Sequence, residues 1–431
     1  MKVLIIGGGG REHALAWKAA QSTDVKQVYV APGNAGTRLE PNIENADVNV
    51  DDIPGLLQFA RQQNIDLTIV GPEAPLVMGV VDAFQDAGLR CFGPTKGAAQ
   101  LEGSKSFSKD FLARHHIPTA AYQTFTDVNA AVDYLKQQPF PIVIKADGLA
   151  AGKGVIIAND FAQASAAVDD MLAGNKFGEA GHRVVIEEFL QGEEASFIVV
   201  ADGKNIVPMA TSQDHKARDD GDTGPNTGGM GAYSPAPVVT AQIHDRIMRE
   251  VIEPTVNGMA QEGNPYTGFL YAGLMVAADG TPKVLEFNCR FGDPETQPIM
   301  MRLQSDLVAL CDAAIDGKLA GVATQWDKRA AVGVVMAAGG YPDHYRKGDI
   351  IEGLPPVGEN ESRCKVFHAG TKTSDTHIVT NGGRVLCVVA LGDSVQQAQT
   401  QAYQQVSKIH WPDVYYRNDI GYRAIAREQS K

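Results

Sequence analysis

Glu286 and Asn288 stand two residues apart in a short, mostly apolar stretch that is typical of a β-strand. Because side chains alternate along a strand with a period of two, both would point to the same face. Mg²⁺ usually takes one or two oxygen ligands from a protein and completes its octahedron with water and phosphate oxygens. The pair therefore indicates a metal site that works on phosphates. A half-buried strand that ends in a polar turn is the alternative for the same residues.

Two glycine-rich turns are candidates for phosphate contacts. The first, at 7–10, separates an apolar strand from a helix that begins at Arg11, and a helix N-terminus attracts anions. It does not match the dinucleotide fingerprint, because Glu12 occupies the position of the third glycine. The second, at 147–154, follows Lys145 and lacks the Walker A spacing. Such a loop can still fold over phosphates, although an ordinary hairpin is the alternative.

Composition limits the classes of function. The chain has 431 residues, a formal net charge of −13 and 44% hydrophobic residues, as in globular enzymes. The negative charge argues against binding to nucleic acid or to an anionic membrane. The five cysteines fit neither a disulfide framework nor a zinc site, and no apolar run is long enough to span a membrane. We therefore expect a cytoplasmic protein.

The elements that must position these residues change in character along the chain. Residues 1–103 alternate buried strands with helices, as in an α/β domain built on a parallel sheet. Residues 104–325 contain several strands and a long, polar, glycine-rich loop at 213–231, and a loop of that length is usually functional or disordered. Residues 326–431 consist of short β segments and an amphipathic helix, which predicts a small α+β domain.

The order of these motifs is similar to that of the ATP-grasp enzymes: a lysine-ended strand, a glycine loop, a Glu-Glu-Phe-Leu segment and a Glu-x-Asn strand. Longer motifs make the resemblance more specific. Gly-Gly-Gly-Gly-Arg-Glu-His at 7–13, Gly-Pro-Glu at 71–73, the 213–231 loop and Arg-Phe-Gly-Asp-Pro-Glu at 290–295 resemble the glycinamide ribonucleotide synthetase (phosphoribosylamine–glycine ligase) family. The resemblance extends over essentially the whole chain, as far as the Tyr-Arg-Asn-Asp-Ile-Gly segment at 416–421.

The resemblance implies a multidomain α/β and α+β fold. It places an N-terminal Rossmann-like substrate-binding domain at 1–103, an ATP-grasp domain with a mobile lid at about 122–193 within 104–325, and a C-terminal α+β domain at 326–431. It also implies an ATP-dependent ligase of purine biosynthesis that uses Mg²⁺ or Mn²⁺ and joins glycine to 5-phosphoribosylamine through a glycyl phosphate. We expect a monomer that makes at most transient contact with the enzyme supplying phosphoribosylamine.

Two alternatives stay open at this point. One is another ATP-grasp carboxylate–amine ligase or carboxylase that acts on a different phosphorylated small molecule. The other is a non-catalytic nucleotide-binding or scaffold protein that kept the fold. Lys145, Glu286, Asn288 and Arg290 together argue against the second alternative, because a site without catalytic work would be free to lose them.

The resemblance also suggests a role for each candidate residue. The expected ATP contacts are Lys105, Lys145, Gly152, Lys153, Gly154, Glu187, Glu188, Phe189, Leu190 and Glu194, with Glu194 on the ribose. Glu286 and Asn288 would hold the metal. Arg290 would neutralise the transferred phosphoryl group or grip a carboxylate, and Asp214 with Lys216 would hold the ammonium of glycine at the reaction centre. The expected contacts to phosphoribosylamine are Gly9, Gly10, Arg11, Glu12, His13 and Glu73.

One position departs from the ATP-grasp pattern. Many of these enzymes carry a third metal-binding acid on the strand before Glu-x-Asn, and the matching position here is Gly273. Either Glu286 works with fewer protein ligands, or an acid from elsewhere completes the site. Asp293 and Glu295 are the candidates, although both also fit ordinary turn and helix-cap roles.

Overall fold

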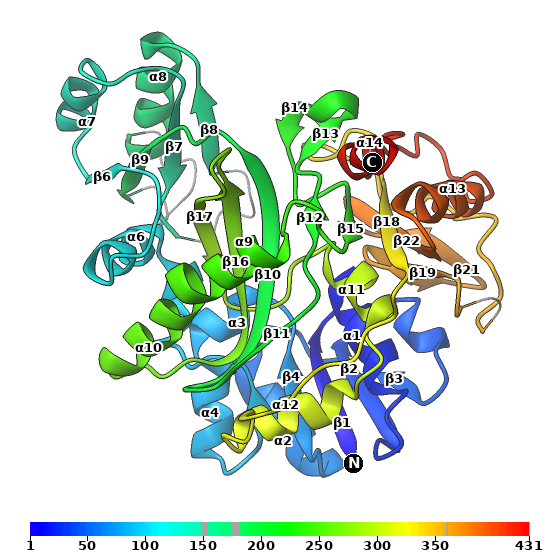
Figure 1. Cartoon of the computed structure of the whole chain (residues 1–431). Coiled ribbons are helices and arrows are strands. Elements are labelled where there is room, and N and C mark those ends of the chain that lie inside the picture. Colours follow the sequence, from blue (N-terminus) through cyan, green and yellow to red (C-terminus); the bar gives the residue numbers. More distant parts are fainter. Residues whose placement is uncertain (149–153, 174–181, 359–360, 431) are drawn as a thin grey trace.

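A parallel sheet organises the N-terminal part of the chain in the computed structural model, which describes residues 1–148, 154–173, 182–358 and 361–430 (Figure 1). Its strand order is β3-β2-β1-β4-β5. Val3 to Ile6 are fully buried, because helices cover the sheet, and this explains their apolar run. The strands are β1 (Lys2–Gly7), β2 (Gln27–Pro32), β3 (Ile43–Asn45), β4 (Leu67–Val70) and β5 (Cys91–Phe92). The helices are α1 (Gly10–Ala19), α2 (Ile53–Gln63), α3 (Glu73–Met78) and α4 (Val80–Asp86).

Two short helices lead from this sheet into the middle of the chain. They are α5 (Gln100–Gly103) and α6 (Lys105–Arg114), and Ser104 separates them. Ser104 is the N-cap of α6, and its hydroxyl accepts a hydrogen bond from the N–H of Phe107. The cap fixes the start of α6 and places Lys105 in its first turn.

The middle of the chain contains two antiparallel sheets. One, at the upper left of Figure 1, has the order β6-β9-β7-β8 and packs against two helices. Its elements are β6 (Tyr122–Phe125), α7 (Val128–Leu135), β7 (Ile142–Ala146), β8 (Val155–Ala158), α8 (Phe161–Leu172) and β9 (Val184–Glu188). The other sheet has the order β11-β10-β16-β17. Its strands are β10 (Glu193–Asp202), β11 (Ile206–Pro208), β16 (Thr267–Val276) and β17 (Pro282–Asn288), with α9 (Ala241–Ile247) and α10 (Glu253–Gln261) between β11 and β16 in the chain.

The C-terminal sheet combines strands from two distant parts of the sequence. Its order is β12-β15-β18-β22-β19, so it crosses the boundary expected at residue 325. The members are β12 (Gln213–Asp214), β15 (Gly231–Ser234), β18 (Ala330–Ala337), β19 (Cys364–His368) and β22 (Arg384–Gly392). A β-ribbon of β20 (Thr371–Ser374) and β21 (His377–Thr380) and the helices α13 (Val395–Val406) and α14 (Tyr422–Gln429) complete this region.

The predicted 213–231 loop is partly regular. Between β12 and β15 the chain forms a small antiparallel pair, β13 (Ala217–Asp219) with β14 (Thr223–Asn226), which lies beside α14 in Figure 1. The residues before and after this pair belong to the C-terminal sheet. The loop is therefore built into the C-terminal region at both ends.

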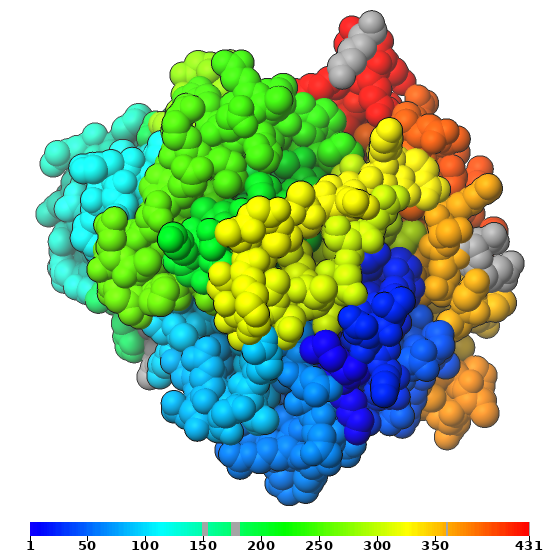
Figure 2. Space-filling model, turned by 60° about the horizontal axis from the view of Figure 1, so that its bottom comes forward, coloured from blue at the N-terminus to red at the C-terminus, as the bar shows by residue number. Residues whose placement is uncertain are grey.

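Two helices join the three regions. They are α11 (Thr296–Arg302) and α12 (Leu307–Ile315); α11 contacts α1 and β18, and α12 contacts β5 and β10. In Figure 2 the segment that follows residue 300 (yellow) lies between the N-terminal segment (blue) and the central sheets (green). Within the described ranges, no helix is both long and apolar enough to cross a membrane.

Candidate functional site

The predicted metal pair lies on β17, where Glu286 is opposite Gly273 of β16. Lys216 reaches this strand from another part of the chain, with its Nζ 3.7 Å from Glu286 Oε1 and 3.0 Å from Glu194 Oε2. The three side chains are between 30% and 39% exposed, so they lie at a surface that a ligand can reach. The positive charges of Lys216, Lys145 and Lys105 outweigh desolvation and lower the pKa of Glu286, which keeps it ionised.

Asp214 completes this charged cluster from β12. Desolvation is the main cause that raises its pKa, and the nearby carboxylates of Glu295, Glu194 and Glu286 add to it. Lys216 acts in the opposite direction, but the pKa of Asp214 still reaches about 8. A carboxyl group with so perturbed a pKa, next to an ammonium and the predicted metal pair, is a candidate for substrate contact.

The expected phosphate-binding lysines also lie near Glu286, and both of them lower its pKa. Lys145 Nζ is 2.9 Å from Glu187 Oε1 and donates to the carbonyl of Leu285 at 3.1 Å. Lys105 Nζ donates to the carbonyl of Gly148 at 2.6 Å, and desolvation lowers its pKa. The structure thus brings both lysines to the strand that carries Glu286.

The segment expected to hold adenine divides into an inner and an outer part. The Glu187 side chain is buried and ion-paired with Lys145 and Lys109, so its carboxylate serves the lysines rather than a base. Glu188 is exposed, Phe189 is half-buried and Leu190 is buried. Gly154 lies directly before the strand β8. Gly152 and Lys153 lie outside the described residues.

The N-terminal turn is organised around Glu12. Its carboxylate accepts from the N–H of Gly9 at 2.7 Å and from Arg11 Nε at 2.5 Å. Substituting any side chain at Gly8 would bring a Cβ within 2.7 Å of the carbonyl of Gly33, so the turn depends on the close approach of two backbones. Glu12 therefore shapes the turn from inside, and Gly9, Gly10 and Arg11 are left as its ligand-facing candidates.

Arg290 grips carboxylates, but they belong to the protein. Its Nε donates to Glu73 at 3.1 Å, and its Nη2 is 2.9 Å from a carboxylate oxygen of Glu102. Burial opposes the ionisation of Glu73, but Arg290 and Arg11 outweigh it and lower the pKa to about 2. Arg290 thus links the strand that carries Asn288 to the N-terminal region.

His13 needs a correction. Its Nε2 is 3.0 Å from Glu40, and its Nδ1 accepts from the N–H of His368 at 2.9 Å. The side chain is 1% exposed, and both ring nitrogens are already bonded inside the protein. Imidazole has no further polar atom to offer a substrate, so we assign His13 to the contact between the N-terminal and C-terminal regions.

Sequence reasoning missed two charged residues that support the site, Lys109 and Glu102, and it left the role of Glu295 open. Lys109 pairs with Glu187 at 2.8 Å, and its spacing of four residues from Lys105 on a helix was the available signal. Glu102 pairs with Arg290 and accepts from the N–H of Cys289 at 2.7 Å, and no pattern in the sequence indicates either contact. Glu295 is 3% exposed and accepts from Ser196 Oγ at 2.9 Å, which places one of the two acids considered for the Gly273 gap inside the protein.

The donor set suits a metal that takes few protein ligands. Glu286 and Asn288 alternate onto one face of β17, and the described residues contain no cluster of three or more His, Cys, Asp or Glu arranged around a common point. One carboxylate and one amide oxygen fit Mg²⁺ or Mn²⁺ bridging phosphates, and they do not fit a cage made of protein ligands alone.

Comparison with solved structures defines the class. The crystal structure of phosphoribosylamine–glycine ligase from Thermotoga maritima superposes with a TM-score of 0.83 and 34% identity, over 97% of this chain and 100% of that one. The biotin carboxylase domain of 2-oxoglutarate carboxylase from Hydrogenobacter thermophilus, solved with MgADP and bicarbonate, gives a TM-score of 0.74 over 96% and 91%. At 16% identity this second likeness shows the fold alone. The fold is that of an ATP-grasp enzyme.

Sequence comparisons define the family. Models of phosphoribosylglycinamide synthetase match its N domain at residues 1–102, its ATP-grasp (A) domain at 103–296 and its C domain at 331–423. The phosphoribosylamine–glycine ligases of Vibrio vulnificus and Escherichia coli O157:H7 are 68% and 67% identical over 431 residues, which is 100% of each chain. The chain belongs to the phosphoribosylamine–glycine ligase family. It is an ATP-dependent ligase of purine biosynthesis.

Proposed function

We propose that this chain joins glycine to 5-phospho-D-ribosylamine with ATP, giving glycinamide ribonucleotide, ADP and phosphate. The observation that carries the proposal is the position of Lys216, which bridges Glu194 and Glu286 beside Asp214. The groups expected to bind ribose, metal and glycine come from three separate segments of the chain. They meet in one partly exposed cluster of charged side chains. A fold kept for another purpose would not require them to meet.

ATP binds between the two antiparallel sheets of the middle region in this proposal. Lys105 and Lys145 neutralise its phosphates, and backbone groups at 187–190 hold the adenine. Glu194 accepts from the ribose hydroxyls once Lys216 turns away from it, an exchange that their partial exposure permits. Glu286 and Asn288 would hold Mg²⁺ or Mn²⁺, and the cation would reduce the repulsion that the negative charges of the phosphates create.

Glycine reacts next to Asp214 in this mechanism. Asp214 pairs with the ammonium of glycine, and Lys216 orients the carboxylate. The glycine carboxylate attacks the γ-phosphorus of ATP, ADP leaves, and the amine of phosphoribosylamine then displaces phosphate from the glycyl phosphate. No protein nucleophile is required, so the chain contributes position and charge.

Phosphoribosylamine occupies the N-terminal side. Its phosphate lies at the turn of Gly9 and Gly10, at the N-terminus of α1, whose dipole favours an anion, although the N–H of Gly9 is already bonded to Glu12. Arg11 and Glu73 flank that turn, and Arg290 connects it to β17. This arrangement would bring the amine toward the glycyl group from the side opposite to ATP.

The test is an assay of phosphate release and product with each substrate omitted in turn. We expect product only when glycine, phosphoribosylamine and ATP are all present. The Glu286→Ala variant should lose activity about 10²- to 10³-fold, because one charged group of a preorganised site is removed. Glu44→Ala, at an exposed position of β3, is the matched control and should stay active. Product formed without glycine, or wild-type turnover by Glu286→Ala, would contradict the proposal.

The proposal includes the setting of the enzyme. We divide the chain into regions 1–103, 104–325 and 326–431, with 122–193 as a lid over ATP. We expect a cytoplasmic monomer in transient contact with the enzyme that supplies phosphoribosylamine. Five free cysteines support a reducing compartment. Gel filtration tests the monomer, and slower hydrogen exchange at 122–193 on adding ATP tests the lid.

A further inference from the structure

His215 lies between the two residues proposed to bind glycine, and it is anchored elsewhere. The His215 side chain is 4% exposed, and its Nε2 accepts from the N–H of Gly421 at 3.0 Å. A neutral imidazole whose Nε2 accepts carries its proton on Nδ1, and that atom lies 3.5 Å from Asp222. In extended chain, neighbouring side chains point to opposite sides, so His215 faces the C-terminal region while Lys216 faces Glu194 and Glu286.

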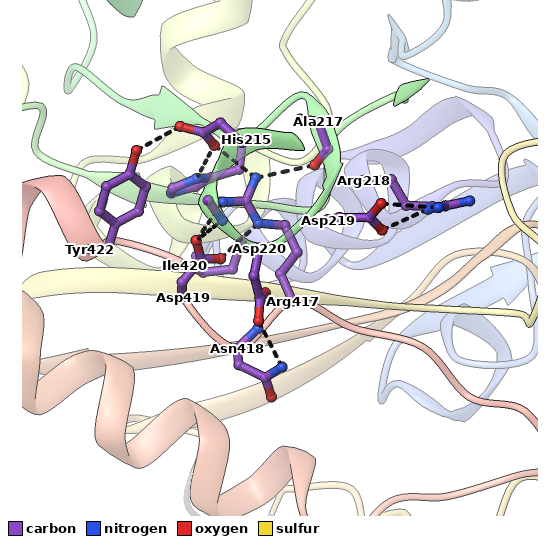
Figure 3. A network of polar contacts seen from close by, with 12 residues as sticks. His215, Ala217, Arg218, Asp219, Asp220, Arg417, Asn418, Asp419, Ile420 and Tyr422 are labelled. Atoms are coloured by element: carbon purple, nitrogen blue, oxygen red, sulfur yellow. Dashed lines mark hydrogen bonds and ion pairs between the residues drawn. The ribbon is translucent and has the colours of Figure 1, made fainter. Parts of the chain in front are cut away.

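Arg417, from the C-terminal part of the chain, binds the loop that contains His215 (Figure 3). The Arg417 side chain is fully buried, and its Nη1 donates to Asp222 at 2.8 Å and to the carbonyl of Ala217 at 3.1 Å. Its Nε and Nη2 donate to the two carboxylate oxygens of Asp419, each at 2.8 Å. A buried guanidinium with this many donors in use is held in one geometry.

Further contacts join the same two segments. Tyr422 donates to Asp222 at 2.7 Å, and Tyr415 donates to Asp219 at 2.8 Å. The N–H of Asn418 donates to Asp220 at 2.8 Å, as Figure 3 shows. We call residues 415–423 the C-terminal clamp. Its bonds reach 215–222, the part of the chain that directly follows Asp214.

We propose that the C-terminal clamp sets the position of Asp214 and Lys216 for the reaction, with His215 and Arg417 as positioning residues. This inference rests on the proposed role of Asp214 and Lys216 in binding glycine. None of the clamp contacts described above reaches the charged cluster around Glu286. The clamp would therefore act on rate and glycine affinity through the geometry of the loop.

The test compares the variants Arg417→Met and His215→Phe with wild type. His215→Phe keeps a ring beside Tyr233 and Tyr422 but removes both polar contacts. We expect kcat/KM for glycine to fall by about 10- to 100-fold, because a small displacement of reacting groups has that effect. The KM for glycine should rise more than the KM for ATP, and Arg417→Lys should recover part of the loss.

Lys365→Met is the control. Lys365 is a buried cation of the same C-terminal region, but its partners are Glu40 and Glu361, outside the clamp. If Lys365→Met lowers the melting temperature as much as Arg417→Met and also lowers kcat/KM for glycine as much, general destabilisation explains the loss and the inference is overturned. If Arg417→Met does not fold, His215→Phe and Tyr422→Phe carry the same comparison.

The inference and the proposed function can fail separately. Asp214→Asn should be inactive if the proposed function is right. An inactive Asp214→Asn together with wild-type kinetics of the folded clamp variants would overturn the inference alone. An active Asp214→Asn would instead overturn the role of Asp214 on which the inference rests.

Discussion

Two lysines of this protein each bridge a pair of glutamates, and the two clusters differ in burial and distance. Lys216 lies 3.0 Å from Glu194 and 3.7 Å from Glu286, with side chains 30% to 39% exposed. Lys365 lies 2.7 Å from both Glu40 and Glu361, and the side chains of Lys365 and Glu40 are only 3% and 5% exposed. The same residue types therefore form one open cluster and one closed cluster.

The difference shows which cluster is available to a ligand. A partly exposed lysine such as Lys216 can exchange one carboxylate for a substrate group, because water screens the ion pair and little free energy is needed to separate its charges. A buried pair with short bonds has no such freedom, since breaking it leaves a charge in the protein interior. Burial is the main cause that lowers the pKa of His13 and His368 beside Lys365, so the closed cluster excludes further positive charge.

The largest expected effect is that of Lys216→Met on activity. Removing the ammonium should lower kcat/KM for glycine by about 10³-fold, or roughly 4 kcal/mol, because a charge that orients the reacting group is lost. The melting temperature should change little, since the cluster is partly exposed. Steady-state kinetics and thermal unfolding of the purified variant measure both quantities. A variant that is active but unstable would reverse the comparison.

The same substitution in the closed cluster should give the opposite result. Lys365→Met leaves Glu40 buried without its cation, which should lower the free energy of unfolding by about 3 kcal/mol. Activity at a temperature where the variant is folded should stay near that of wild type. Denaturant unfolding and the glycine assay test the pair of expectations. A large loss of kcat in a stable Lys365→Met would show that the closed cluster also serves the site.

A further expected effect is a change in how stability depends on pH. Asp214 releases its proton near pH 3.8 when unfolded and near pH 8 when folded, so the folded state binds more protons between these values. Its contribution to stability is present at acid pH and is lost as the pH rises toward 8. Asp214→Asn stays uncharged, so it should gain stability relative to wild type from about pH 5 to about pH 8. Melting temperatures measured across this range in the absence of substrates test the sign. A constant difference would mean that Asp214 titrates normally.

Much of the local structure could be predicted because neighbouring residues decide it. The alternation of residues 282–288 gives the strand β17, and the Asp279-Gly280 turn joins it to β16, with Gly273 opposite Glu286 as expected. Ser104 caps α6, a role that serine commonly takes at a helix N-terminus. These features depend on side-chain period and backbone preference, which act over a few residues.

Contacts between distant segments could not be predicted in the same way. His13 looked like part of a phosphate-binding turn, but one turn of helix directs its ring toward Glu40 and the backbone of His368. Glu102 had no motif at all, although it meets Arg290 from 188 positions earlier in the chain. The loop at 213–231 was expected to be functional or disordered, and no local pattern indicated that Arg417 would hold it through Ala217 and Asp222.

By itself the sequence determined the family, the order of the elements and the residue types of the site, because motifs such as Arg-Phe-Gly-Asp-Pro-Glu at 290–295 are local and specific. Only the tertiary structure decided which charges are free to meet a ligand. Lys216 and Lys365 are the same residue type, and the partners of neither follow from the residues next to it in the chain. Their burial depends on which segments pack around them, and burial decides whether an ion pair can open.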